Sequence, residues 1–329
     1  MSFRPLTRNI PLLATAATCL ILYGAAAGLF YDRRFVSPRV LIDFFSDNAV
    51  LGIAAIGMTY VILTGGIDLS VGSVVGLVSI VLAVSIEQLK IPAYIGIPLS
   101  LGLGLAFGLG MGVIINFFNL PPFLVTLAGM FLARGLAFVI KLESVAITSQ
   151  LDQITTTLKI PLGETLEIPS TALILLCTFI LGMLILRYTN FGRNIYGLGS
   201  NEQSALLMGL PVGRTRIAVY GVSGFCAALA GVVHALYTSS GNPTAGSGLE
   251  LDAIAAVVIG GTLLSGGVGN ISGTLIGVLI FGIIQSAIMF QGTLSSWWTK
   301  IVIGFLLLIF ILLQKLLQTQ KINALAKQH

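Results

Sequence analysis

The chain has 329 residues, of which 56% are hydrophobic and only 9% are charged, and its mean hydropathy is +1.01. A globular core of this length cannot enclose so much apolar surface, so the composition excludes an ordinary water-soluble fold and predicts an all-α membrane protein. The net charge of +5 would suit nucleic-acid binding. However, the basic residues fall at the ends of apolar runs and in short loops, where membrane topology explains them, and we expect no nucleic-acid partner.

Taken in order, the chain is a series of apolar runs separated by short polar stretches, which predicts about ten membrane helices. We expect them at residues 10–30, 48–64, 69–86, 92–118, 121–140, 170–186, 217–237, 251–264, 271–290 and 297–317. The first run follows Arg4 and Arg8 and resembles a signal peptide. It is about twice the length of a typical signal-peptide core, so we expect a retained helix. The charges of residues 31–47 nearly cancel, and we expect an outer loop there.

The connections between these helices predict the topology. Ten crossings place both chain termini and the basic segment 188–216 on one side, which the bias of Lys and Arg toward inside loops makes the cytoplasm. The long polar stretch 141–169 then lies on the opposite side, and 238–247 is expected as a further loop. The glycine-rich breaks at 65–68 and 265–270 stay open, because each could be a loop or a re-entrant segment.

A short motif occurs twice and bears on internal symmetry. Gly65-Gly66-x-x-Leu69-Ser70-x-Gly72 matches Gly260-Gly261-x-x-Leu264-Ser265-x-Gly267. Two inverted halves of five helices are common in transporters, but the predicted topology puts both motifs on the inner side, at non-equivalent junctions. An inverted repeat and chance similarity in glycine-rich sequence therefore both stay open.

The basic segment 188–216 is the most distinctive polar stretch of the chain. Its arginines, together with the adjoining Arg187, are opposed by a single acid, Glu202. We expect residues 1–329 to form a single transmembrane domain in which this segment is the cytoplasmic loop.

A short helix is predicted within the basic segment. Ser200 or Asn201 would be its N-cap, while Gly209 ends it and Pro211 prevents its return. So short a helix cannot cover its own apolar side, so we expect that side to contact another protein. The apolar residues in question are Leu206, Leu207 and Met208.

This helix carries a resemblance to a known family. The run Gly199-x-Asn201-x-x-x-Ala205-x-x-x-Gly209-Leu210-x-Val212 is similar to the E-A-A-type loop of ATP-binding-cassette importer permeases. It is closest to the sugar-permease branch that includes the ribose and galactofuranose systems. In that family the short helix docks in a groove of the cytoplasmic ATPase. The resemblance thus implies ATPase-coupling roles for Asn201, Glu202, Ala205, Leu206, Gly209 and Leu210. The chain departs from the family pattern at Ser204, where Ala is more usual.

Three further segments resemble the same branch, so that the similarity covers nearly the whole chain. They are Thr64-Gly65-Gly66-Ile67-Asp68-Leu69-Ser70-Val71-Gly72, Pro121-Pro122-Phe123-x-x-Thr126-Leu127 with Arg134-Gly135, and Gly260-Gly261-Thr262-x-Leu264-Ser265-Gly266-Gly267-x-Gly269. The resemblance implies a multi-pass permease of the bacterial inner membrane that forms half of a monosaccharide pathway, with a galactofuranose importer as the nearest likeness. It also implies three partners: a cytoplasmic ATPase, a second permease subunit (identical or paralogous) and a periplasmic sugar-binding protein.

Polar residues inside the apolar runs are candidates for the translocation path. Asp68 and Arg134 are the ionisable residues nearest the hydrophobic interior, where a charge is costly and usually faces a cavity or a partner. For Asp68, capping of the following helix is an equal alternative, and for Arg134, anchoring of neighbouring helices is favoured over sugar contact. Hydroxyl and amide groups that could bind a sugar weakly, or could instead join helices, are Thr59, Tyr60, Asn116, Thr126 and Gln285.

The sequence does not favour catalysis. It has no Gly-x-x-x-x-Gly-Lys-Ser/Thr phosphate loop, and we interpret His234 as a hydrogen-bonded core residue. The three cysteines fall in apolar runs without metal-ligand spacing. We therefore predict no catalytic site, no metal and no cofactor, with ATP hydrolysis left to a partner.

Two alternative functions belong to other classes. A self-sufficient secondary transporter or channel for a small polar solute would usually carry several intramembrane acids, and Asp68 is almost alone. A membrane enzyme would need a nucleophile or a metal cluster at the membrane surface, for which His234 is poor support.

Overall fold

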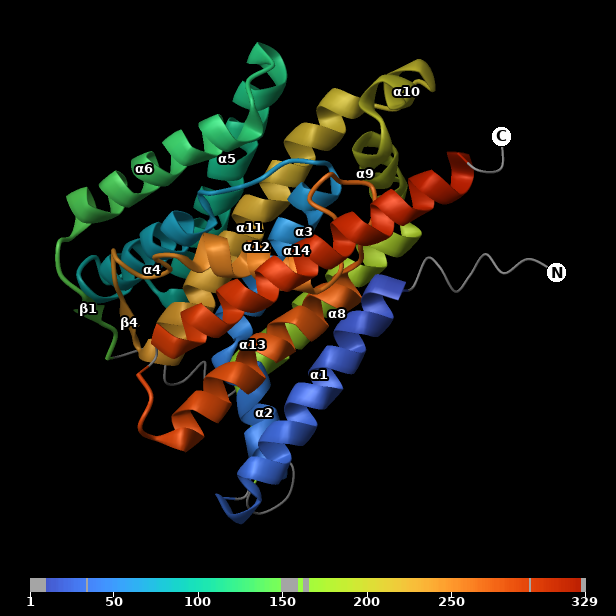
Figure 1. The fold of residues 1–329 in the computed structure, drawn as a ribbon. Helices are drawn as coiled ribbons and strands as arrows, with labels where there is room; N and C mark the ends of the chain where they lie inside the picture. The colour runs from blue at the N-terminus through green and yellow to red at the C-terminus, as the bar shows by residue number, and fades with distance from the viewer. Residues whose placement is uncertain (1–9, 34, 149–158, 162–165, 296, 327–329) are drawn as a thin grey trace.

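The structure is a computed structural model that describes residues 10–33, 35–148, 159–161, 166–295 and 297–326, with side chains described between residues 12 and 312. The helices lie side by side in a long bundle (Figure 1), so the predicted all-α fold is confirmed. In chain order the elements are α1 (Ile10–Leu29), the 3-10 helix η1 (Tyr31–Arg33), α2 (Pro38–Asp47), α3 (Ala49–Leu63), α4 (Val71–Glu87), α5 (Ala93–Phe118), α6 (Pro122–Ile140), β1 (Val145–Ala146), β2 (Ile160–Pro161), β3 (Glu167–Ile168), α8 (Ser170–Tyr188), α9 (Asn190–Ser200), α10 (Glu202–Leu207), α11 (Val212–Thr238), β4 (Ser240–Gly241), α12 (Leu249–Ile259), α13 (Ile271–Gln291) and α14 (Trp297–Ala326).

Within the described residues, six helices are long and apolar enough to cross a membrane: α1, α5, α6, α8, α11 and α13. The pair α2 and α3, bent by 54°, would form a seventh crossing, and α4 and part of α14 are shorter apolar helices. The expected number of ten crossings stays a prediction. One of the ten expected helices corresponds to α12, which has only 11 residues. A helix of that length spans about 16 Å, roughly half of the hydrocarbon thickness.

Helix α11 packs against α3, α4 and α5, and its contact with α5 is a seam of small residues. A Cβ atom at Gly108 would lie 2.2 Å from the carbonyl oxygen of Tyr220, and one at Gly104 would lie 2.4 Å from the Cβ atom of Ala228. Only glycine lets the two backbones approach so closely, which is how helices commonly associate in lipid. The glycine content of α5 is therefore a packing requirement.

One non-helical segment, residues 239–248, lies inside the bundle along α4. The Ser79 hydroxyl donates to the carbonyl oxygen of Asn242 at 3.2 Å. A Cβ atom at Gly72 would lie 2.1 Å from the carbonyl oxygen of Gly246. The loop expected at 238–247 thus consists of the short strand β4 followed by turns, and it packs on α4 before α12 begins. Backbone without helical hydrogen bonds is tolerated at such a place only where protein surrounds it.

A second non-helical segment joins α3 to α4. The hydroxyl of Thr126 donates to the carbonyl oxygen of Ile67 at 3.2 Å, and Asp68 is fully buried. A Cβ atom at Gly66 would lie 2.4 Å from the Tyr220 hydroxyl. In the break expected at 65–68, Gly66 and Asp68 are therefore buried, with α6 and α11 beside them, whereas Gly65 is exposed.

Helices α3 and α11 run antiparallel, since Gly57 lies against Ser223 while Gly66 lies against Tyr220. Each is followed by a non-helical segment and then by another helix, α4 after α3 and α12 after α11. This layout is what two inverted halves predict. The two copies of the repeated sequence motif lie close together, since the Gly267 amide donates to the Leu63 carbonyl at 2.9 Å, beside the first copy.

The outer loop expected at 31–47 is wrong in part, because it contains the helix α2. The Ser37 hydroxyl accepts from the Val40 amide, and Pro38 occupies the first turn, where its missing N–H costs nothing. Phe35 and Phe44 are buried against α1 and α13. Burial of these two rings stabilises α2. The nearly balanced charges of the region gave no indication of this helix in the sequence.

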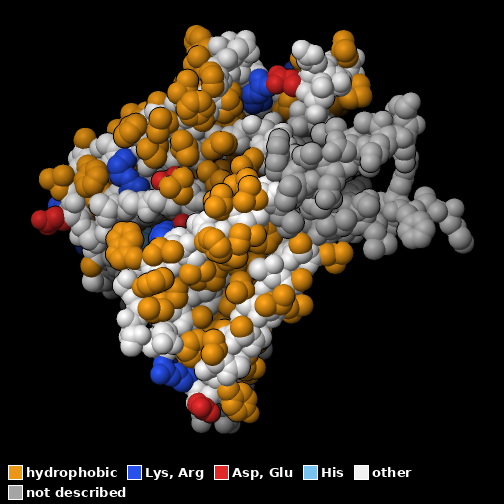
Figure 2. All heavy atoms as spheres, in the orientation of Figure 1, with side chains coloured by type: hydrophobic (Ala, Val, Ile, Leu, Met, Phe, Trp, Pro, Cys, Tyr) orange, Lys and Arg blue, Asp and Glu red, His pale blue; other side chains and the backbone are white. Residues whose placement is uncertain are grey.

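The outer face of the bundle is apolar. Figure 2 shows mainly hydrophobic side chains over the visible face, with few charged ones between them. Only 28% of the membrane-length window is buried in α5 and likewise in α6. Exposed apolar surface on this scale requires lipid or a protein partner. The basic residues Arg4 and Arg8 lie outside the described residues.

Candidate coupling surface and translocation path

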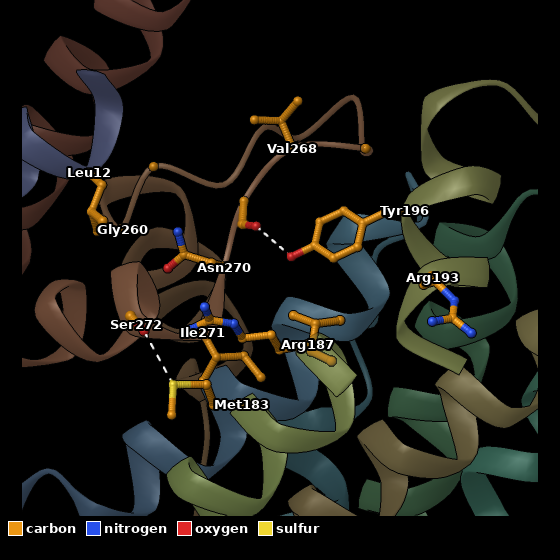
Figure 3. A pocket seen from close by; sticks show the side chains of 14 residues that line it. Leu12, Met183, Arg187, Arg193, Tyr196, Gly260, Val268, Asn270, Ile271 and Ser272 are labelled. Carbon is orange, nitrogen blue, oxygen red and sulfur yellow. Dashed lines mark hydrogen bonds between the residues drawn. The ribbon is translucent and has the colours of Figure 1, made fainter. Parts of the chain in front are cut away.

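The predicted cytoplasmic loop is helical over most of its length, and α9 fastens it to the bundle. Thr189 accepts from the Gly192 amide at 3.2 Å and so caps α9. A Cβ atom at Gly199 would lie 1.8 Å from the Leu63 carbonyl oxygen, so the end of α9 touches the end of α3. The Tyr196 hydroxyl donates to the carbonyl of Gly269 at 2.8 Å (Figure 3). Helix α9 therefore contacts the chain beside both glycine-rich breaks, at Leu63 before the first and at Gly269 in the second.

Helix α10 is anchored on one side and bare on the other. Its N-cap is Asn201, whose side-chain oxygen accepts from the Ser204 amide at 2.8 Å. Of the two caps expected from the sequence, Ser200 and Asn201, the structure therefore uses Asn201. Ala205 is fully buried against Leu198 and Val212. In contrast, Leu207 is 90% exposed, and α10 projects from one end of the bundle (Figure 1).

The turn after α10 is fixed by its backbone. Gly209 has φ of +74°, a conformation that glycine adopts without strain. The Leu210 amide then donates to the Ala205 carbonyl at 3.0 Å, a helix-ending arrangement. Glu202 pairs with Arg216 at 2.5 Å and ties the start of α10 to α11.

The six predicted coupling residues therefore divide by location. Asn201, Glu202, Gly209 and Leu210 shape and hold the helix, Ala205 points into the protein, and Leu206 is exposed. The exposed apolar tip is completed by Leu207 and Met208, which the family motif does not include.

Three of the predicted path residues are buried and hydrogen-bonded between helices. The Thr59 hydroxyl lies 2.7 Å from that of Thr274 and joins α3 to α13. The Tyr60 hydroxyl donates to the Gly182 carbonyl at 2.6 Å and joins α3 to α8. Thr126 joins α6 to the α3–α4 segment through Ile67, as described above. These contacts match the helix-joining alternative, although Tyr60 also borders an apolar cavity of about 750 Å³ between α3, α5, α8 and α11.

Asp68 accepts three hydrogen bonds in a fully buried position. Its Oδ1 accepts from the amide of Ser70 at 3.0 Å and from the Ser70 hydroxyl at 2.7 Å. Its Oδ2 accepts from the Ser223 hydroxyl at 2.7 Å. The helix α4 begins at Val71 with Ser70 at the N-cap position, so Asp68 holds the approach to that helix and is not the cap itself.

Arg134 contacts the non-helical segment 239–248. Its Nη1 donates to the carbonyls of Pro243 at 2.5 Å and of Ala245 at 3.0 Å. These bonds satisfy backbone groups that no helix satisfies. The sequence favours anchoring of neighbouring helices for Arg134, and these hydrogen bonds run from α6 to a non-helical segment, so its role stays a prediction.

The last two path residues differ from the others. Asn116 is half-buried near the end of α5, where its amide lies 3.0 Å from the position of a Cβ atom at Gly213. Gln285 is exposed on α13. Neither of these two residues lines the apolar cavity that Tyr60 borders, and neither do Asp68 and Arg134.

Sequence reasoning missed the groups that complete these contacts. Ser223 is 155 positions from Asp68, and a serine inside an apolar helix carries no visible signal of its partner. The sequence does show the turn before α12, because Gly246 and Gly248 directly precede a helix with acids in its first turn, but it does not show that Arg134 contacts this segment. No group of three or more His, Cys, Asp or Glu side chains that could hold a metal ion occurs among the described residues.

Comparison with known proteins gives a consistent result. Residues 40–311 match the family described as branched-chain amino acid transport system / permease component. The inner membrane ABC transporter permease protein YjfF of Escherichia coli is 46% identical over 310 residues, covering 94% of this chain and 92% of that protein. The fructose import permease protein FruG of Bifidobacterium longum is 38% identical, covering 93% and 91%. The ribose import permease protein RbsC of Bacillus subtilis is 41% identical, covering 86% and 87%.

No solved structure matches the chain. The family model covers most of the sequence, and the relatives align over nearly their whole lengths. The apolar helices of membrane-spanning length agree with a membrane permease. The chain therefore belongs to the family of ATP-binding-cassette importer permease components.

Proposed function

We propose that this chain forms half of the membrane pathway of a bacterial inner-membrane importer for a monosaccharide, and that α10 couples it to a separate cytoplasmic ATPase. Support for the substrate class comes from the relatives, which include fructose and ribose import permeases. The galactofuranose class is a narrower expectation from the sequence and stays a prediction. The observation that carries the coupling role is the exposed tip Leu206–Met208 on an otherwise anchored helix.

The same proposal includes the partners and the sidedness. Arg193, Arg214 and Arg216 lie in or beside the projecting helices, and Arg187 ends α8, so this end of the bundle is the cytoplasmic one by the bias of basic residues. A second permease subunit, identical or paralogous, would complete the pathway. A periplasmic sugar-binding protein would deliver the sugar to the opposite end.

The alternative of a self-sufficient transporter receives little support. Asp68, the acid on which ion coupling would depend, already accepts hydrogen bonds from Ser70 and Ser223 and is fully buried. A cation or proton carrier usually needs access from a water-filled path. Uptake by the purified chain in vesicles without any ATPase would nevertheless establish that alternative.

A pair of leucine substitutions tests the coupling role. Leu207→Glu places a charge at the centre of the exposed tip, whereas Leu89→Glu places one on an equally apolar, 65% exposed site at the far end of α4. Loss of a central interface contact typically costs at least about tenfold in affinity. We expect Leu207→Glu to lose co-purifying ATPase and sugar uptake by that factor, while Leu89→Glu keeps its ATPase.

The opposite result would contradict the coupling role. If Leu207→Glu retains both ATPase association and uptake at normal membrane abundance, α10 is not the docking element. Uptake of labelled ribose, fructose and galactofuranose by the assembled importer then identifies the sugar independently of the docking result.

A further inference from the structure

One acid of the chain has a buried oxygen without a partner. Glu250 lies in the first turn of α12, just outside the apolar stretch 251–264, and α12 packs against α4. Its Oε2 is buried and has no hydrogen-bond partner among the described atoms. The other three side-chain oxygens in this situation belong to the hydroxyls of Ser100, Tyr220 and Thr262. A negative charge on a buried oxygen without a donor is costly, so the charged form of Glu250 is disfavoured here.

The neighbour of this oxygen is a backbone carbonyl. The carbonyl oxygen of Gly246 lies 2.1 Å, and Oε2 of Glu250 lies 2.2 Å, from one point, the position of a Cβ atom at Gly72 on α4. The two oxygens are therefore close together. The Gly246 carbonyl accepts from the Leu249 amide at 3.1 Å, and a carbonyl oxygen can accept a second hydrogen bond. Two acceptors repel each other unless a proton lies between them, and a protonated carboxyl group supplies that proton.

The charged groups around Glu250 do not bond this oxygen. Arg134 of α6 acts on the carboxyl group through space, but its Nη1 donates to two backbone carbonyls of the segment 239–248. Asp252 is the other charged neighbour, and it is paired with Lys300 of α14. A charge on Oε2 would therefore have no direct partner among the described atoms.

Burial favours the neutral form of this carboxyl group. Residues 71–86 of α4 and the segment 239–248 contain no titratable side chain, so neither element supplies a group that could neutralise a charge on Glu250. Burial is the largest effect on the carboxyl group and raises the pKa of Glu250 above its ordinary value. The amides of Gly248 and Glu250 and the charge of Arg134 act in the opposite direction, with smaller effects. The carboxyl group therefore keeps its proton to a higher pH than an exposed glutamate does.

We infer that Glu250 carries a proton on Oε2 and donates a hydrogen bond to the carbonyl of Gly246, so that a pH-sensitive contact holds the turn before α12 against α4. Because the protonated form holds the turn, the contact is fully present at low pH and is lost as the pH rises through the pKa of the folded state. The ionised form would place a negative oxygen against the carbonyl oxygen and would loosen the segment 239–248. The inference is independent of the sugar and of the coupling role of α10.

Infrared spectroscopy of the full-length chain in detergent tests the proton directly, because a carboxylic acid and a carboxylate absorb at different frequencies. The Glu250 signal is the difference between the parent chain and Glu250→Gln, titrated from about pH 4 to about pH 9. We expect a carboxylic acid signal whose midpoint lies at least about one pH unit above the ordinary glutamate value of about 4.3. Asp252→Asn should keep this signal, because Asp252 is paired with Lys300. A lower midpoint would overturn the inference.

Thiol labelling tests the contact itself. Ala245→Cys, in a chain that also carries Cys177→Ser, reports on the segment 239–248, since Ala245 is only 8% exposed. The labelling rate in this chain is divided by the rate in the same chain with Glu250→Gln, whose amide donates at every pH. The ionisation of the thiol affects both rates equally. We expect the ratio to be near one while Glu250 is protonated and to rise about fivefold as it ionises.

A leucine variant separates the hydrogen bond from the charge. Leucine cannot donate, so Glu250→Leu should label about fivefold faster than Glu250→Gln at every pH. Equal rates for these two variants, or a ratio that stays constant where the infrared signal titrates, would overturn the contact with Gly246. Faster labelling of Glu250→Gln than of the parent chain at every pH would also overturn it, because an ionised Glu250 would then be the form that holds the segment.

Discussion

The hydroxyl of Ser223 donates a 2.7 Å hydrogen bond to Oδ2 of Asp68 and joins the middle of α11 to the segment between α3 and α4. Both side chains are fully buried. A carboxylate in such a place keeps its stability only while its donors remain. The contact therefore sets the position of α11 relative to the buried approach to α4.

Ser223→Ala should destabilise the protein by about 1–3 kcal/mol, because it leaves a buried carboxylate oxygen with one donor fewer. The thermal unfolding midpoint in detergent measures the effect. Ser100→Ala is the matched control, since the Ser100 hydroxyl is buried on α5 with no hydrogen-bond partner among the described atoms. Equal midpoints for the two variants would show that the Ser223 contact adds no stability.

The glycine seam gives a second prediction. Gly108→Ala would place a Cβ atom 2.2 Å from the Tyr220 carbonyl oxygen, whereas Gly110→Ala meets nothing within 4 Å. Overpacking typically costs about 1–3 kcal/mol, while alanine at an open helix position stabilises by up to about 1 kcal/mol. We expect Gly108→Ala to unfold earlier than the parent chain and Gly110→Ala to unfold no earlier. The reverse order would show that α5 and α11 do not meet along this seam.

Local composition predicted the long helices well, because an apolar run of membrane length has few other solutions. The cap at Asn201 and the stop at Gly209 were also visible, since both depend on neighbouring residues. What could not be predicted depends on distant partners. The segment 239–248 looks like an external loop until Arg134 and Ser79 are seen to satisfy its carbonyls.

The helix α2 and the candidate path show the same limit. The start signals of α2, Ser37 followed by Pro38, were present in the sequence, but the balanced charges of the region suggested a loop. Thr59 and Thr126 were identified as polar residues within apolar runs, yet only the structure shows their hydrogen bonds to Thr274 and Ile67. A polar side chain in an apolar run indicates that a hydrogen-bond partner is needed. Only the structure shows whether another helix supplies that partner.

Arg134→Gln should loosen the segment 239–248, because the shorter amide cannot make both hydrogen bonds to Pro243 and Ala245. The rate of thiol labelling at Ala245→Cys, in a chain that also carries Cys177→Ser, reports on access to this 8% exposed position. We expect labelling to accelerate by at least about tenfold. Arg39→Gln, on the exposed surface of α2, should leave the rate unchanged. An unchanged rate in Arg134→Gln would mean that the segment is held by other contacts.

The turn at Gly209 gives a graded prediction. Its φ of +74° disfavours β-branched residues most and asparagine least, and no neighbouring atom lies within 4 Å of an added Cβ atom. Gly209→Val should therefore reduce uptake and ATPase association more than Gly209→Asn does, with normal membrane abundance in both. The sugar-stimulated ATPase rate of the assembled importer distinguishes them. Identical rates for both variants would show that the geometry of this turn does not affect coupling.

Helix α10 ends at Leu207 and α11 begins at Val212, with Ala205 wedged beneath and Glu202 fastened to Arg216, so almost no slack separates the two. Helix α11 is 27 residues long, or about 40 Å. A displacement of α10 would therefore tilt α11 as a rigid body. The far end of α11, where residues 239–248 follow, would move with it. If α10 couples to an ATPase as proposed, α11 would transmit its displacement directly from one face of the bilayer to the other.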